Sequence, residues 1–175
     1  MSSVALSFAL AAAVVGAVTD LHSRRIPNLL TLVTLTGGLL LHAATGGPTG
    51  LGLSLLGVLA VGVPATVLFA LRAMGGGDVK LLAGCGALLG PAAGLQLLLA
   101  TAVAGGILAV GMVFANRALA VTGHNLLRLF GHWRRRGLTP CPAVSLGATR
   151  GVTLPYGVAI ACGMLFTFAS RLGGA

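Results

Sequence analysis

The sequence has almost no acidic side chains. Its 175 residues include 11 lysines and arginines, two aspartates and no glutamate, which gives a formal net charge of +9. Charged residues make up 7% of the chain, against about 25% in an average soluble domain. So few charges cannot cover a water-facing surface, and hydrophobic residues reach 57%. The composition therefore excludes a soluble globular protein and predicts a polytopic membrane protein surrounded by a lipid bilayer.

Cysteine is scarce as well. Cys85, Cys141 and Cys162 form no Cys-x-x-Cys motif and their number is odd, so neither a disulfide framework nor a zinc site is expected. Asp20 and His22 are only two residues apart and would not face each other on a helix. No serine or cysteine has a recognisable base and orienting group beside it. We therefore expect no metal, no cofactor and no nucleophilic side chain.

Glycine, in contrast, is abundant at 28 residues, and small residues let helices pack closely in lipid. The fold class predicted is all-α, with about six transmembrane helices in a single membrane-embedded domain covering residues 1–175. The fourth apolar span is short, and it begins either at residue 80 or within the glycine-rich loop before it. No basic residue precedes Arg24, so we interpret the first span as a membrane helix and not as a signal peptide. The six apolar spans are 3–20, 29–45, 51–71, 80–90, 93–115 and 153–170.

The basic residues lie almost entirely in alternate connections. Ten of the 11 fall in the segments 21–28, 72–80 and 116–152, whereas the connections at 46–50 and 90–92 carry none. The positive-inside rule makes the basic side cytoplasmic and places both termini outside. Because the basic charge follows the membrane topology, no nucleic-acid partner is expected. Localisation in the inner (cytoplasmic) membrane follows, with both aspartates at the cytoplasmic face.

The basic segment 116–136 has two interpretations. Leu119, Leu126, Phe130 and Trp133 can share one face of a helix, which would lie in the headgroup region with the tryptophan as its anchor. The alternative is a solvated loop that carries the charges demanded by topology. The sequence leaves both open.

The two aspartates, Asp20 and Asp78, suggest a shared site. A carboxylate near a membrane is costly to desolvate and is usually kept for a function. Two carboxylates held close together do not both ionise easily, so one can take a proton from water while the other donates to a peptide carbonyl. The open alternatives are an ion pair between Asp20 and Arg24, an N-cap by Asp78 for a helix that begins near Val79, and a pathway for protons or ions.

The residues before Asp78 are three consecutive glycines, Gly75, Gly76 and Gly77. Glycine adopts backbone angles closed to other residues and lets another chain approach closely. A substrate helix must open before its amide can be attacked, and bare backbone beside a carboxylate gives the extended segment a place to bind. The alternative is a flexible turn between two helices.

Three short motifs resemble those of type IV prepilin peptidases. Gly75-Gly76-Gly77-Asp78 is similar to the Gly-x-Gly-Asp motif of intramembrane aspartyl proteases, and the segment GGGDVKL resembles its prepilin peptidase form. Asp20 with the downstream Ile-Pro-Asn at 26–28 is similar to the first aspartate motif of that family. Leu-Pro-Tyr-Gly at 154–157 resembles its C-terminal motif. The three occur in the family's order.

The resemblance implies an aspartic endopeptidase that removes the leader of prepilins and pseudopilins at the cytoplasmic membrane face. It implies Asp20 and Asp78 as the catalytic pair. Substrate binding is expected at the three glycines 75–77 and at Pro155, Tyr156 and Gly157. The methyltransferase-associated segment of longer members is not seen, so the chain resembles the short form of Flp (tight adherence) pili. Rival interpretations are a small proton or ion transporter and a non-catalytic pilus-assembly subunit. The oligomeric state is not predicted.

Overall fold

The structure is a computed structural model that describes residues 3–71, 73–115, 124, 131–132, 134 and 155–173. Its elements are α1 (Ser3–Ser23), α2 (Asn28–Ala70), α3 (Gly76–Ala115) and α5 (Tyr156–Leu172). The predicted all-α class is confirmed for these described residues. The predicted interfacial helix at 116–136 falls, apart from four isolated positions, outside the described residues.

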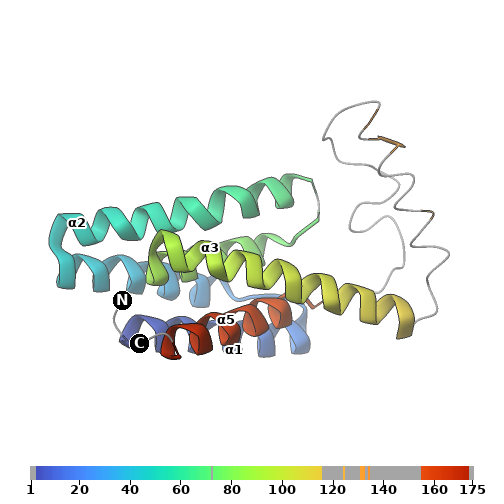
Figure 1. Cartoon of the computed structure of the whole chain (residues 1–175), viewed down its shortest axis with the longest axis horizontal. Helices are drawn as coiled ribbons and strands as arrows, with labels where there is room; N and C mark the ends of the chain where they lie inside the picture. The colour runs from blue at the N-terminus through green and yellow to red at the C-terminus, as the bar shows by residue number, and fades with distance from the viewer. Residues whose placement is uncertain are drawn as a thin grey trace.

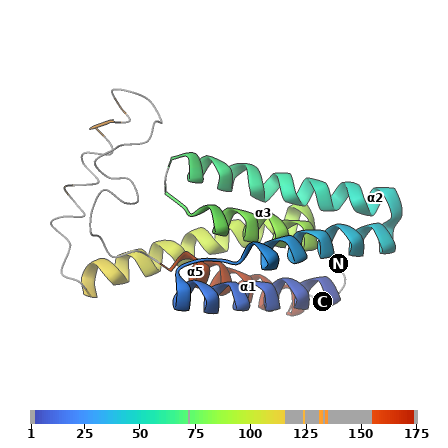
Figure 2. The same cartoon turned by 180° about the vertical axis from the view of Figure 1, so that it is seen from behind.

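Two of these helices are broken at a glycine. Gly47 has φ 58° and ψ −145°, and Gly90 has φ 73° and ψ 179°, a backbone region that is essentially restricted to glycine. A proline follows each of them, and proline suits the first turn of the helical segment that comes next. As a result, α2 and α3 each fold back on themselves as a helical hairpin (Figures 1 and 2).

The surface of the described part is apolar. Within these ranges, α1, α2 and α3 are long and apolar enough to cross a membrane, and α5 is a shorter apolar helix. Large aliphatic side chains such as Leu29, Leu99 and Ile107 are about 70% exposed. Water would oppose this arrangement, whereas lipid tails accept it without cost. The structure is therefore compatible with a membrane protein.

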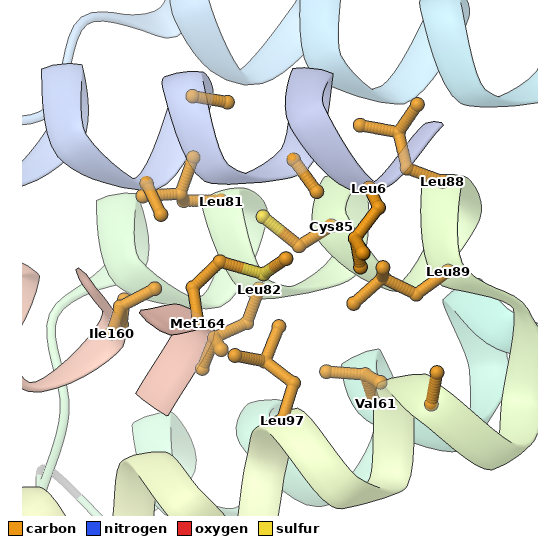
Figure 3. Packing of buried hydrophobic residues seen from close by; sticks show 14 of the residues in the cluster. Leu6, Val61, Leu81, Leu82, Cys85, Leu88, Leu89, Leu97, Ile160 and Met164 are labelled. Carbon is orange, nitrogen blue, oxygen red and sulfur yellow. The ribbon is translucent and has the colours of Figure 1, made fainter. Parts of the chain in front are cut away.

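The core forms around the first half of α3. Leu81, Leu82, Cys85 and Leu88 are completely buried there, and α1, α5 and the second halves of α2 and α3 surround them (Figure 3). This segment touches protein on every side, which explains why its residues are mostly small or apolar. It is the central element on which the rest of the helices pack.

A buried hydrogen bond compensates for the break at Gly90. The break, together with the missing N–H of Pro91, leaves the Ala87 carbonyl without its usual helical donor. The hydroxyl of Ser54 on α2 donates to this carbonyl at 2.8 Å. In a membrane, such a carbonyl must find a partner within the protein. The same two helices touch backbone to backbone at Gly57, where any side chain would collide with α3.

The structure decides between the two predicted starts of the fourth span. The helix begins within the glycine-rich loop, at Gly76, and not at residue 80, so Gly76 and Gly77 belong to its first turn. The alternative of a flexible turn for these glycines is wrong, because only Gly75 precedes the helix. The correction matters for function, because the starts of α2, α3 and α5 and the end of α1 all meet near this turn.

Candidate active site

The residues expected to be functional lie at helix ends. Asp20 is in the last turn of α1, and Asp78 is in the first turn of α3. Asn28 is the first residue of α2, and Gly157 is the second residue of α5. At a helix end the backbone has polar groups without partners in the helix, so this is where a site can use them.

A cavity of about 280 Å³, which we call the aspartate cavity, contains both carboxylates. The connection between α1 and α2 forms one side, and the glycines at the start of α3 form the other. At Gly77 the approach is close, because an added Cβ would lie 3.1 Å from the Cβ of Ile26. The cavity is lined by Asp20, Arg24, Arg25, Ile26, Asn28, Gly75, Gly76, Gly77 and Asp78.

Asp78 is held by the turn that precedes it. Its half-buried carboxylate accepts a hydrogen bond from the backbone of Gly75, the residue just before α3. This is the reach-back contact of a capping box, from the third helical residue to the N-cap. The expectation that Asp78 itself caps a helix starting near Val79 is wrong, since the helix begins three residues earlier. An added Cβ at Gly75 would lie 2.8 Å from Oδ2 of Asp78, so glycine there leaves room for the carboxylate.

Asp20 occupies a helix end that does not suit it. The partial negative charge at the C-terminus of a helix disfavours a carboxylate, so α1 alone gives Asp20 no stabilisation. Its Oδ2 accepts a hydrogen bond of 2.9 Å from the backbone N–H of Gly157. α1 ends at Ser23, and the next residue, Arg24, has a φ of 53°, which is the left-handed conformation, and donates its N–H to the Asp20 carbonyl at 2.8 Å.

The two carboxylates interact electrostatically. Both are half-buried, and the charge of Asp20 acts on Asp78 across the aspartate cavity. The charge of Asp78 also reaches the hydroxyl of Tyr156, whose ring packs beside Gly105 on the second half of α3. The structure therefore brings Asp20, Asp78 and the start of α5 together around one small volume.

The C-terminal motif is placed differently from the glycines. Pro155, Tyr156 and Gly157 are not among the described residues that line the aspartate cavity. Gly157 contacts Asp20 directly and is buried. Their expected contact with substrate therefore stays a prediction, and the contact seen here is with the carboxylate.

Several residues of the site had a weaker signal in the sequence. Arg24 and Arg25 read as topology determinants, yet both line the aspartate cavity. Asn28 belongs to the Ile-Pro-Asn motif, and its Oδ1 accepts a hydrogen bond of 3.0 Å from Nζ of Lys80 on α3. That motif was the available signal, but its role only becomes visible when α2 and α3 are seen side by side.

Histidine, cysteine and aspartate side chains offer little for a metal. Within the described ranges, no three of them lie close enough together to hold an ion. Carboxylates can take up and give a proton, which is the chemistry that the residues of this cavity offer.

An all-helical apolar protein with two half-buried carboxylates in one cavity has the features of a membrane-embedded aspartic peptidase. Over residues 7–110 the sequence matches the type IV leader peptidase family, an aspartic peptidase family, and the chain belongs to it. The matched region contains both aspartates and the three glycines, and it ends before α5. Comparison with curated proteins and with solved structures finds no match.

Proposed function

We propose that the protein is an intramembrane aspartic endopeptidase that removes the leader of type IV prepilins and pseudopilins. The observation that carries the proposal is that Asp20 and Asp78, the only acidic side chains of the chain, line one cavity together with the glycines of the motif. A structural role for each acid would not require them to share a cavity.

In the proposed reaction the pair begins with one ionised and one protonated carboxyl group. The ionised member takes a proton from water as the water oxygen bonds to the scissile carbonyl carbon, and the protonated member gives its proton to the carbonyl oxygen. In the second step the C–N bond breaks. The amine nitrogen receives a proton from the first carboxyl, and a hydroxyl returns a proton to the second. Neither step forms a bond between enzyme and substrate.

Substrate binding is proposed at the start of α3. The N–H groups in the first turn of a helix have no acceptor within it, and Gly76 and Gly77, both in the first turn of α3, line the aspartate cavity. We assign their N–H groups to the carbonyl groups of an extended substrate segment, with Gly75 giving Asp78 room. A contact of Pro155, Tyr156 and Gly157 with substrate is proposed as well, from the start of α5 beside Asp20.

The proposed topology follows from the two hairpins. If each half of α2 and α3 crosses the bilayer, then with α1 and α5 the chain has six crossings. The basic connections then lie in the cytoplasm and both termini lie outside. The aspartate cavity, which includes Arg24 and Arg25, faces the cytoplasmic side of the inner membrane. The exposed aliphatic side chains along the helices support a lipid environment.

Among family substrates, we propose prepilins of the Flp (tight adherence) type. The resemblance of the chain to the short form of the family supports this assignment. Two arginines in the aspartate cavity oppose a basic leader, so the basic residues of the leader are expected to bind outside this cavity.

The test is cleavage of a Flp-type prepilin by the purified protein in liposomes. We expect a mature product whose new N-terminus, read by mass spectrometry, follows the leader. Asp20→Asn and Asp78→Asn should each abolish it while the protein still inserts. A transporter would instead produce proton or ion flux without any added peptide, and a non-catalytic assembly subunit would tolerate both substitutions.

A further inference from the structure

The start of α5 touches Asp20 through backbone rather than through a side chain. Gly157 is buried, and its N–H donates to Oδ2 of Asp20 at 2.9 Å across 137 residues of sequence. Since Gly157 is the second residue of α5, its N–H is among those with no acceptor inside the helix. The Asp20 carboxylate therefore accepts a hydrogen bond from an N–H group that has no acceptor within α5.

The helix polarities point to the same role. Asp20 lies at the negative end of the α1 dipole, which disfavours its charge. The positive end of α5 lies against the same carboxylate and offsets this effect. Asp78 needs no such partner, because it lies at the favourable end of its own helix. The two acids of the pair are therefore supported in different ways.

The contact also explains why residue 157 is glycine. A Cβ added there would lie 2.8 Å from Cβ of Asp20, 3.1 Å from its Oδ2 and 3.1 Å from the carbonyl oxygen of Gly16. Any side chain would push α5 away from α1 and lengthen the hydrogen bond. Glycine brings the backbone of α5 within reach of the carboxylate.

We propose that Gly157 is a positioning residue of the aspartate pair: its N–H holds Oδ2 of Asp20, so that Oδ1 faces the water that attacks the substrate. This inference rests on the proposed peptidase function and adds to it. It assigns to α5 a role in arranging the pair, whereas the C-terminal motif was expected to contact substrate. Among the described residues, the charged groups that line the cavity with Asp20 are Arg24, Arg25 and Asp78, and Tyr156 precedes Gly157 at the start of α5.

The sharpest test removes only the donor. Replacing Gly157 by glycolic acid turns its amide into an ester, which deletes the N–H and adds no atoms that could collide. In steady-state cleavage of the prepilin in liposomes, we expect kcat to fall on the order of 10- to 100-fold with KM unchanged, because misplacing a catalytic group slows chemistry and not binding. The matched control is the same ester at Gly163, in the same helix, where the N–H is remote from the pair.

Each outcome decides the inference. The inference is overturned if the protein with the ester at Gly157 cleaves prepilin as fast as the unmodified protein. It is also overturned if the two ester variants lose the same cleavage rate, because the contact would then serve only helix packing. A rise in KM with unchanged kcat would assign Gly157 to substrate binding instead. If the unmodified protein cleaves nothing, the peptidase function itself is refuted. If the unmodified protein is active and both aspartate variants are inactive, the peptidase function stands, whatever the two esters show.

As a second variant, Gly157→Ala is compared with Gly163→Ala. Both methyl groups would enter tight contacts, with Asp20 in one case and with Thr101 in the other. We expect both to lower stability but only Gly157→Ala to lower kcat of the folded fraction. Equal kcat values in the two folded variants would contradict the positioning role.

Discussion

Replacing the two aspartates singly and together tests whether they act as one unit. Asparagine keeps the size of the side chain and removes both the charge and the ability to take a proton from water. General acid–base catalysis contributes about 10²- to 10⁴-fold, which corresponds to about 3 to 5 kcal/mol of transition-state stabilisation. Because Asp20 and Asp78 line one cavity and interact electrostatically, each single variant should lose this whole factor.

The double variant makes the prediction quantitative. If both groups act on the same water and carbonyl, removing the second after the first costs little, so the double variant should be no slower than the worse single one. Independent contributions would instead multiply, to a loss of about 10⁴- to 10⁸-fold. The shared cavity therefore predicts strong non-additivity.

The assay is single-turnover cleavage with enzyme in excess over a prepilin in liposomes, which isolates chemistry from product release. The folded amount of each variant is measured first. Asp78→Asn should fold, since the new carboxamide oxygen can still accept the hydrogen bond from Gly75. Thr19→Val is the control, because Thr19 precedes Asp20 and its hydroxyl donates to carbonyls of its own helix, at 3.0 Å. Full processing by either single variant, or losses that multiply, would refute the shared site.

Three further predictions concern packing and the cavity. Ser54→Ala should lower the free energy of unfolding by about 1–3 kcal/mol, because it leaves a buried carbonyl unpaired. The control is Thr66→Val, which should change this free energy little, because the exposed Thr66 hydroxyl bonds to a carbonyl of its own helix. Gly57→Ala should cost about 1–3 kcal/mol through collision with α3, whereas Gly52→Ala on the same helix meets no atom within 4 Å and should raise stability, as thermal unfolding in detergent would show. Gly77→Val should lower cleavage more than abundance, since it crowds the cavity wall; loss of the folded protein would assign the glycine a purely structural role.

Much of the fold was predictable because lipid imposes a simple pattern. Long apolar runs in lipid satisfy their backbone hydrogen bonds only as helices, so the all-α class followed from composition. The connections between helices followed from their glycines and their charges. The start of α3 stayed open between residue 80 and the glycine-rich loop, because glycine has a low helix propensity in isolation, and the structure places it at Gly76. Here packing against Ile26 and the reach-back contact of Asp78 stabilise a first turn that propensity does not favour.

The site was predictable in its residues more than in its contacts. Two acids alone in an apolar chain are easy to notice, and the structure does place them in one cavity. The role of Asn28 beside Lys80, and the direction of the Gly157 N–H, depend on helices that are far apart in sequence. No local pattern encodes such contacts, because they arise only when α2, α3 and α5 pack on the central segment.

The polarity of the helices gives the aspartate pair its asymmetry. Asp78 lies at a helix start, where the dipole and the Gly75 backbone favour a carboxylate, so its own element can hold it. Asp20 lies at a helix end, where the dipole opposes a carboxylate, and it accepts a hydrogen bond from the backbone of α5. A pair in which one member depends on a distant helix can be arranged only after that helix has packed. It follows that the matched region, residues 7–110, contains both acids but lacks the N–H group that Asp20 uses.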